Sequence, residues 1–171
     1  MRYRVQRGLV EVKARSSIHD TDTKFAKLEG WIEFDADATA ATRAEISVDM
    51  RIFDAGDKLK NWKLKGDLEP EKYPTATFTL ARLEGAHEPS AGRFEARAVG
   101  QLSWRGRSLD VRLKGQASVD RGSIDARATF DLDVRELGVK PPGFLMFRVD
   151  NVVTVQVSIF AIAGDSPGLG Q

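Results

Sequence analysis

The amino-acid sequence contains no cysteine in its 171 residues. Disulfides, thiolate metal ligands and thiol nucleophiles are therefore excluded, although the absence of cysteine does not select a cellular compartment. Long hydrophobic runs are also missing, because no stretch approaches the roughly 20 apolar residues that a membrane-spanning helix needs. The first part of the chain is polar and strand-like and contains no apolar run that could form a signal-peptide core, so we expect a soluble protein.

An excess of charge of one sign is lacking as well. The 26 lysines and arginines nearly balance the 25 aspartates and glutamates, and the formal net charge is +1. No whole-molecule field would hold nucleic acid or an anionic membrane, so we expect no nucleic-acid partner and no stable membrane insertion. With 42% hydrophobic and 30% charged residues, the composition is that of an ordinary globular protein. We expect one domain over residues 1–163 and a flexible C-terminal tail over 164–171.

Motifs of common catalytic sites are absent too. The sequence has no G-x-S-x-G, no P-loop and no H-E-x-x-H. Its two histidines, His19 and His87, have no acidic or histidine neighbour at the spacings of zinc sites, so we interpret both as loop or edge residues. Asp131 and Asp133 form a D-x-D on the outward side of an expected strand, which is typical of solvated charges. We therefore expect a non-enzyme with no catalytic residue, cofactor or metal.

Alternation of apolar and polar residues is abundant, and it is the pattern of strands with one buried face. It is clearest in the second half, where we expect the even positions of 94–104 and 124–134 and the odd positions of 109–119 to face inward. Turn residues separate these strands. We expect eight strands: 3–14 with a bulge at Gly8, 25–34 with Ala26 and Leu28 inward, 44–52, 76–80, 94–104, 109–119, 124–134 and 153–159.

Sequential antiparallel strands with one apolar face can bury that face by closing into a barrel, which also removes sticky edges. An open sheet packed on helices is the rival architecture. Helical signal is limited to residues 57–65, with Gly66 as the expected C-cap, and a turn near 139–146. We therefore predict an all-β, eight-stranded antiparallel up-and-down barrel with one short helix in the connection between the third and fourth strands.

The expected inward face is rich in small residues, among them Ala96, Gly100 and Gly115. Eight strands enclose just enough space to be filled by side chains or to hold one small ligand, so a small lining favours a hollow barrel. The alternative is that these residues sit where strands cross closely at a barrel end. Strands of about eleven residues would span roughly 36 Å, and a tall apolar slot suits a long hydrocarbon.

Two apolar groups lie in long connections. The first consists of Trp62, Leu64, Leu68 and Tyr73, and the second is the run Phe-Leu-Met-Phe at 144–147. Each could cap a mouth of the barrel, where ligand sites usually open. Each could equally be a small satellite core beneath a loop.

Several stretches match a known family pattern. Gly30, Ile32, Phe34 and Asp35 match G-x-I-x-F-D, and Leu64-Lys65 with Glu-Lys-Tyr-Pro-Thr-Ala-Thr-Phe at 71–78 matches L-(K/R)…(E/K)-K-Y-P-x-x-x-F. Further matches are Gly100, Leu102 and Gly106 to G-x-L-x-x-x-G, Leu137-Gly138-Val139 to F-G-(I/V), and 153–157 to the closing strand. From about residue 9 to 160 the chain resembles the YceI-like family of lipocalin-like barrels that bind polyisoprenoids and related lipids.

The resemblance implies a transport protein of the periplasm or the exterior that holds a prenyl chain, such as a quinone tail or a polyprenyl phosphate precursor, lengthwise in the barrel. It also has departures: Asn61-Trp62 stands where the family commonly has Arg-Asp, and Asp133-Val134 where it has Asn-Arg. The residues alone imply only a long apolar partner, a polyisoprenoid or fatty-acyl lipid. They leave a cytoplasmic location and a homodimer open.

Two alternative functions stay open: a structural or stress-related protein that acts through its surface with a plugged barrel, and a lipid-modifying enzyme. For the carrier we expect a set of apolar residues on the inner face and in the two long connections to contact the ligand. These are Leu28, Ile32, Phe34, Ile46, Val48, Met50, Ile52, Trp62, Leu64, Phe78, Leu80, Phe94, Ala98, Leu102, Trp104, Val111, Leu113, Ala117, Ala128, Phe130, Leu132, Phe144, Met146 and Val155.

Overall fold

The computed structural model describes residues 1–15, 20–139 and 151–164. Over these residues the chain forms nine strands, one α-helix and two short 3-10 helices. Their bounds are β1 (Arg2–Ala14), β2 (Thr21–Phe25), β3 (Leu28–Glu33), η1 (Thr39–Ala41), β4 (Arg43–Asp49), α1 (Lys58–Leu68), β5 (Thr75–Ser90), β6 (Arg93–Trp104), β7 (Arg107–Asp120), β8 (Ser123–Asp133), η2 (Val134–Leu137) and β9 (Val152–Ala163). Within this part of the chain, no helix is long and apolar enough to cross a membrane.

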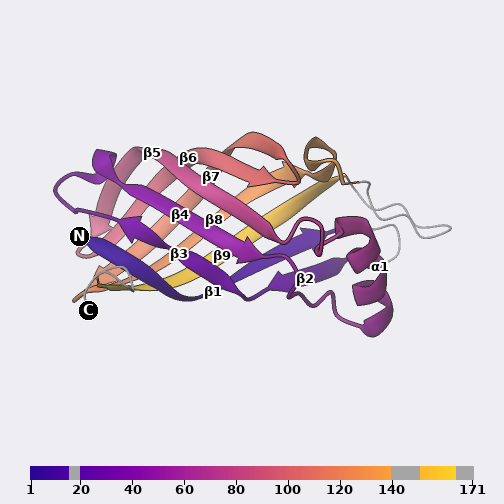
Figure 1. Ribbon diagram of the computed structural model, residues 1–171. Coiled ribbons are helices and arrows are strands. Elements are labelled where there is room, and N and C mark those ends of the chain that lie inside the picture. Colours follow the sequence, from indigo (N-terminus) through magenta and orange to yellow (C-terminus); the bar gives the residue numbers. More distant parts are fainter. Residues whose placement is uncertain (16–19, 140–150, 165–171) are drawn as a thin grey trace.

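The strands pair antiparallel in one sheet of order β2-β1-β3-β4-β5-β6-β7-β8-β9. An additional pairing of β9 with β1 closes this sheet into a barrel, with α1 across one end (Figure 1). β2 pairs with the second half of β1 and β3 with its first residues, so β2 and β3 are two halves of one interrupted strand. The closed circuit therefore has eight strands, which confirms the predicted up-and-down barrel and the position of its helix.

The interruption between β2 and β3 changes the faces that the residues around it present. Ala26 and Lys27 are exposed, whereas Phe25 is only 4% exposed and lines the interior. The predicted inward orientation of Ala26 was therefore wrong. Two outward residues in succession break the period of two before Leu28 resumes the inward pattern.

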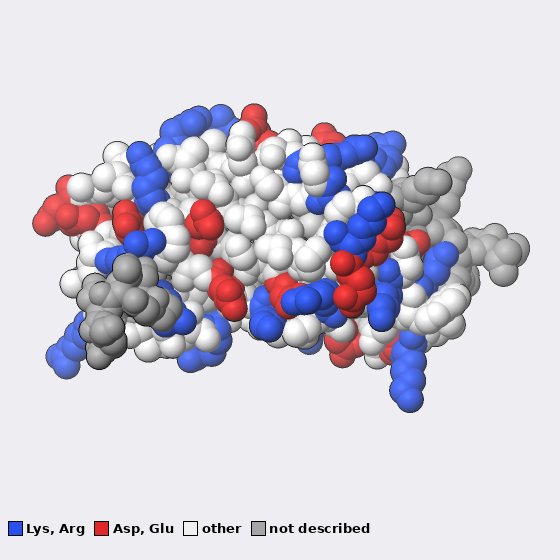
Figure 2. All heavy atoms as spheres, viewed as in Figure 1, with Lys and Arg blue, Asp and Glu red and all other residues white. Residues whose placement is uncertain are grey.

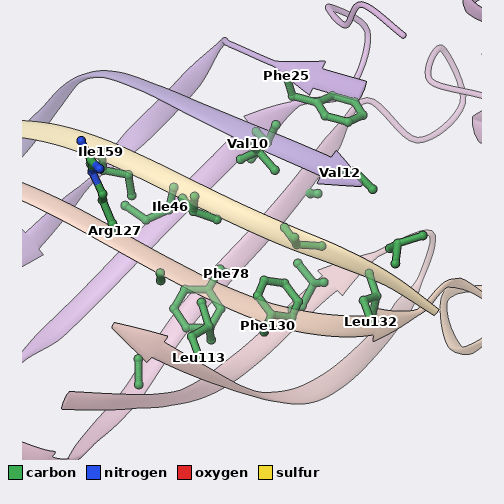
Figure 3. A pocket seen from close by; sticks show the side chains of 18 of the residues that line it. Val10, Val12, Phe25, Ile46, Phe78, Leu113, Arg127, Phe130, Leu132 and Ile159 are labelled. Atoms are coloured by element: carbon green, nitrogen blue, oxygen red, sulfur yellow. The ribbon is translucent and has the colours of Figure 1, made fainter. Parts of the chain in front are cut away.

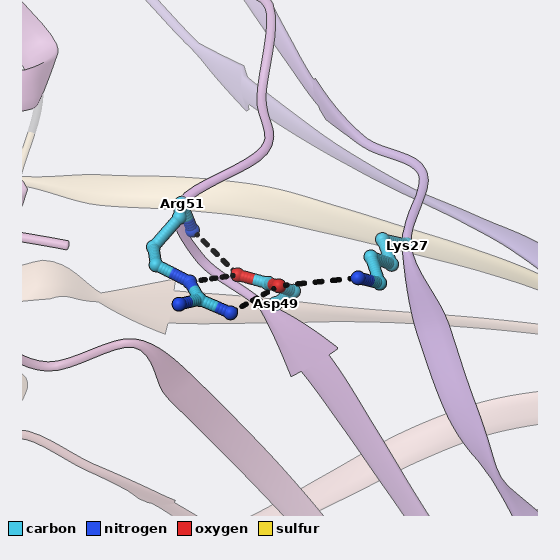
Figure 4. Close-up of polar contacts among 3 residues, drawn as sticks. All are labelled: Lys27, Asp49 and Arg51. Atoms are coloured by element: carbon cyan, nitrogen blue, oxygen red, sulfur yellow. Dashed lines mark hydrogen bonds and ion pairs between the residues drawn. The ribbon is translucent and has the colours of Figure 1, made fainter. Parts of the chain in front are cut away.

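Asp49, the last residue of β4, contacts Lys27 in the break between β2 and β3 (Figure 4). Its backbone N–H donates to the Lys27 carbonyl oxygen at 3.0 Å, and its carboxylate lies 3.7 Å from the Lys27 Nζ. Arg51 donates to both oxygens of that carboxylate, at 3.0 Å from Nε and 2.9 Å from Nη2. These hydrogen bonds lower the pKa of Asp49 to about 2, so the carboxylate stays ionised in mild acid.

The helix is longer than predicted. It begins after Asp57, whose carboxylate accepts the Lys60 backbone N–H at 2.8 Å, and it runs through Gly66 to Leu68. Gly66 is therefore not the C-cap; Glu69 has the left-handed backbone instead, with φ of 50°. The side chain of Arg105 donates to the Leu68 carbonyl oxygen at 2.8 Å and so satisfies one of the terminal carbonyls.

Strand β5 is also longer than predicted. It has 16 residues, whereas the alternation marks only 76–80. Register shifts after Leu80 and Glu84 disrupt the period of two while pairing with β6 continues to Ser90. On β1 the register shift falls between Val5 and Arg7, not at the predicted Gly8.

The last three hairpin strands follow the predicted alternation. The β6–β7 turn places Arg105 and Gly106 at positive φ, and the β7–β8 turn does the same with Arg121 and Gly122, as two-residue hairpins of this hand require. The predicted inward positions of 94–104, 109–119 and 124–134 are all buried or half-buried, and most of them line the interior. They alternate with exposed residues such as Arg97.

Candidate functional site

The barrel encloses a cavity of about 700 Å³. This volume is within the range of about 300–1,000 Å³ that is usual for small-molecule sites. Figure 3 shows apolar side chains from opposite walls, including Ile46, Phe78 and Phe130, directed into the same space. The cavity runs along the interior of the barrel, because residues from every strand of the sheet contribute to its lining.

Most of the residues that the sequence predicts to contact a ligand line this cavity. They are Ile32, Phe34, Ile46, Val48, Met50, Leu64, Phe78, Leu80, Phe94, Ala98, Leu102, Trp104, Leu113, Ala117, Ala128, Phe130, Leu132 and Val155. Alternation locates nearly all of them, because the inward face of a strand follows from the period of two. Their contact with a ligand stays a prediction.

Four expected residues lie elsewhere. Leu28 and Val111 are each 7% exposed and are packed within the protein without bordering the open space. Ile52 is 49% exposed, because β4 ends at Asp49 and the alternation does not continue beyond it. Trp62 is 72% exposed on the outer side of α1, so it does not cap the mouth as part of the lining.

Some predictions fall on parts of the chain that the structure does not describe. Phe144 and Met146 belong to 140–150, and His19 belongs to 16–19. The predicted turn at 139–146 lies outside the described residues except for Val139, and the predicted tail at 164–171 except for Gly164.

Further lining residues were missed by the sequence-based list. Val10, Val12 and Ile159 line the cavity from β1 and β9. The alternation of their strands is visible in the sequence and could have identified them. Phe25 could not have been found in this way, because the break at Ala26 hides its face.

The small inward residues divide into two classes. A Cβ at Gly30 would collide with the Glu45 carbonyl oxygen, and one at Gly100 with the Thr79 carbonyl oxygen, so these glycines permit close approach of neighbouring strands. A Cβ at Gly115, in contrast, would find its nearest neighbours at 3.6 and 3.7 Å, which is ordinary contact. Close approach of strands therefore explains some of the small residues and open space explains others, but the close approaches lie within the strands and not at a barrel end as the alternative had it.

The end of the barrel near the N-terminus is filled by side chains. Tyr3, Ile124 and Ala161 form a buried cluster there, at 5%, 3% and 0% exposure. The rings of Phe34 and Phe94 pack edge to face, with centroids 5.0 Å apart. A ligand that reaches this end of the cavity therefore meets mainly apolar side chains, with Thr42 also in the lining.

The opposite end lies under α1. Leu64 lines the cavity from the helix, and Leu68 is buried in a core cluster with Phe25, Met50 and Trp104. The predicted lid group thus splits: Leu64 and Leu68 face inward and Trp62 faces solvent. The mouth is bordered by Asp57, Leu59, Lys60 and Lys63 of the helix region and by Val12, Ala14, Thr21 and Thr23 of β1 and β2.

A second group of polar residues reaches the margin of the cavity through the wall. Glu95, Gln116 and Arg127 are adjacent across β6, β7 and β8, and all three are exposed. The inward neighbours on these strands are alanine and glycine, such as Ala96 and Gly115, so the open space extends close to the backbone here. Figure 3 shows Arg127 together with the apolar side chains that line the cavity.

The fold and cavity can be compared with known proteins. A model of the YceI-like domain matches residues 4–161. This chain belongs to the YceI-like family. No curated protein matches this chain.

Solved structures share the fold of this YceI-like domain. Burkholderia cenocepacia BcnA is 20% identical with a TM-score of 0.71, over 92% of this chain and 96% of that chain. A polyisoprenoid binding domain from Saccharophagus degradans, implicated in plant cell wall breakdown, is 15% identical with a TM-score of 0.73, over 95% and 98%. The Campylobacter jejuni YceI protein is 17% identical with a TM-score of 0.66, over 84% and 85%. At these identities the likeness shows the fold alone.

Lysines and arginines are interspersed with aspartates and glutamates on the face of the barrel that Figure 2 shows. The ionisable groups with clearly shifted pKa values do not line the cavity. Hydrogen bonds to arginines lower the pKa of Glu84 and Asp133, and burial raises the pKa of Asp67. His87 pairs with Glu95 at 3.2 Å on the exposed surface. Across the three described ranges no cluster of histidine and acidic residues could hold a metal ion. The arrangement offers apolar contact, and its chemistry is that of binding a hydrophobic molecule.

Proposed function

We propose that this YceI-like domain binds and carries one long apolar molecule, a polyisoprenoid, a quinone tail or a fatty-acyl lipid, inside its barrel. The observation that supports the proposal is the apolar cavity of about 700 Å³, with a buried apolar cluster at one end and charged residues at the other. Each buried methylene contributes about 0.8 kcal/mol, which corresponds to roughly a four-fold gain in affinity per carbon. A long tail along the lumen can therefore supply the binding free energy without polar contacts.

The proposal is for binding and not for catalysis. Of the described residues that border the cavity, the ionisable ones are Asp57, Lys60 and Lys63 at the mouth and Glu95 and Arg127 at the margin. A reacting bond in the middle of the lumen would have no general acid or base beside it. A single barrel holds the whole cavity, so the proposed binding does not need a second copy of the chain.

We also propose that the domain works in the periplasm or outside the cell, on the family resemblance alone. Fractionation of cells that express the natural gene tests this point. The chain is expected in the periplasmic or secreted fraction, and recovery with cytoplasmic markers would contradict it.

An organic extract of the purified protein, read by mass spectrometry, tests the carrier function. We expect a long-chain lipid at close to one equivalent that is absent from an extract of a size-matched protein purified in parallel. A protein that yields no lipid and binds none when lipid is added would support a surface role instead. If the lipid is chemically altered after incubation with the protein, the result would support the alternative of a lipid-modifying enzyme.

A further inference from the structure

Charged side chains of the described residues border the cavity in two places. One is the mouth under α1, with Asp57, Lys60 and Lys63; the other is the wall, with Glu95 and Arg127. The two places differ in their surroundings. Glu95 and Arg127 are exposed on the outer surface, whereas Lys60 and Lys63 are half-buried at the rim of the lumen.

Lys60 is the distinctive group at the mouth. Its ammonium has no hydrogen-bond or ion-pair partner among the described residues. The nearest acid in sequence, Asp57, uses its carboxylate to cap α1 by accepting the Lys60 backbone N–H at 2.8 Å. An anion placed beside this ammonium would form a charge-assisted hydrogen bond with it.

Lys63 stands beside Lys60 but is engaged within the helix. Its charge acts on Asp67, whose pKa rises through burial and is lowered in part by Lys63. Asp57, Lys60 and Lys63 are the charged groups of the helix and its N-cap that line this end of the cavity. Lys60 is therefore the group available to an incoming anion, with Lys63 as a weaker contributor.

The shape of the cavity determines how an amphiphile would lie in it. The far end holds Tyr3, Ile124 and the Phe34–Phe94 pair, so the contacts that it offers a ligand are mainly apolar. A chain that enters through the mouth must therefore place its tail toward this far end. Its polar end then remains under α1, beside Lys60.

We infer that the cargo is an amphiphile with an anionic headgroup, a carboxylate or a phosphate, which Lys60 holds at the mouth while the apolar tail lies along the barrel. The inference rests on the proposed function and narrows it. It favours fatty acids and prenyl phosphates over neutral quinones. Charge-assisted hydrogen bonds are about twice as strong as neutral ones, so the headgroup selects among tails of equal length.

The test compares three probes with the same twelve-carbon tail: dodecanoate, dodecyl phosphate and dodecanol. Each is titrated into the delipidated full chain at pH 7.5 below its micellar concentration, by displacement of a fluorescent fatty-acyl probe. We expect both anions to bind at least roughly tenfold more tightly than dodecanol, because a hydrogen bond between two charged groups is stronger than one to a neutral hydroxyl. The anion that binds more tightly identifies the class of headgroup, carboxylate or phosphate. Salt at 0.5 M should reduce the preference.

Variants separate Lys60 from its neighbours. Lys60→Met should remove most of the preference for anions over dodecanol, and an unchanged melting temperature shows that the barrel is intact. Lys60→Gln repeats the test with a polar side chain. Lys58→Met is the matched control, because Lys58 is an exposed lysine of the same helix that does not line the cavity. It should leave all three affinities unchanged.

Two results would overturn the inference while the proposed function stands: equal affinity for the three probes, or loss of the anion preference in Arg127→Met and not in Lys60→Met. The second would place the headgroup at the wall. Failure of all three probes to bind would instead overturn the proposed function, and the inference with it.

Discussion

The indole Nε1 of Trp104 donates a hydrogen bond of 2.9 Å to the backbone carbonyl oxygen of Tyr73. Trp104 lines the cavity at the end of β6, and Tyr73 belongs to the segment that returns from α1 to β5. The guanidinium of Arg105 lies 4.4 Å from the centre of the Tyr73 ring and also holds the end of the helix. The Lys-Tyr-Pro part of the family motif therefore anchors α1 across the mouth of the barrel.

Replacement of Trp104 by Phe should show how much the hydrogen bond to Tyr73 contributes to the free energy of unfolding. The Tyr73 carbonyl would lose its partner in a partly buried site, which typically costs about 1–3 kcal/mol in the free energy of unfolding. Urea denaturation measures the change. Trp31→Phe is the control, since Trp31 stacks with Arg2 on the outside and its loss should cost less than about 1 kcal/mol. Equal effects of the two substitutions would contradict this role of Trp104.

The triple substitution Ala98→Leu, Ala117→Leu and Ala128→Leu should fill the lumen. All three alanines line the cavity, so added methylenes meet open space and binding should be lost while the melting temperature stays near that of the wild type. Gly100→Ala provides the contrast, because its Cβ would collide with a β5 carbonyl and typically cost about 1–3 kcal/mol. A triple variant that melts far below wild type, or that still binds a prenyl probe tightly, argues against a hollow barrel.

Asp49 should make stability depend on pH in acid. Its pKa in the folded protein, lowered by Arg51 to about 2, is below the value of about 3.9 expected when unfolded. The stabilisation is therefore present above about pH 4 and is lost as the pH falls from there toward 2. Denaturation midpoints of wild type and Asp49→Asn should converge over this window. The control Trp31→Phe, which removes no ionisable group, should keep a constant offset from wild type over the same window. A constant offset for Asp49→Asn would refute the prediction.

The cap of α1 can be tested by Asp57→Ala. Loss of an N-cap acceptor typically costs about 1 kcal/mol and frays the first turn, so amide hydrogen exchange should speed up in α1 and not in β6 or β7. Asp57→Asn retains a capping oxygen and should behave as wild type. Identical exchange in all three proteins would show that the helix does not depend on this cap.

Much of the fold could be predicted from the sequence because its strands are long and alternate regularly. In β6, β7 and β8 the hairpin turns fix the register, so the inward face from Phe94 to Trp104 follows directly from the period of two. The errors have local causes. Phe25 and Ala26 exchange faces at a two-residue break, and the shifts within β5 after Leu80 and Glu84 hide its second half.

The site was predictable where it follows the strands and not where it depends on the helix. Strand residues such as Ile46 and Phe130 line the cavity as alternation predicts. In α1, Leu64 faces inward and Trp62 is exposed, although both are apolar. Which side of a short helix faces the barrel depends on how its ends are held, here by Asp57 and Arg105, and no periodic pattern in eleven residues reveals that contact.

The central claim is that a long apolar chain occupies the lumen, and its most direct test is a titration of the delipidated protein with neutral n-alkanols of increasing length. The account predicts one saturable site whose affinity rises roughly four-fold per methylene until the chain fills the cavity and then levels off. In the single variant Ala117→Leu, the affinity should level off at a shorter alkanol than in the wild type. Binding that does not saturate, or an affinity that is independent of chain length, would contradict the account.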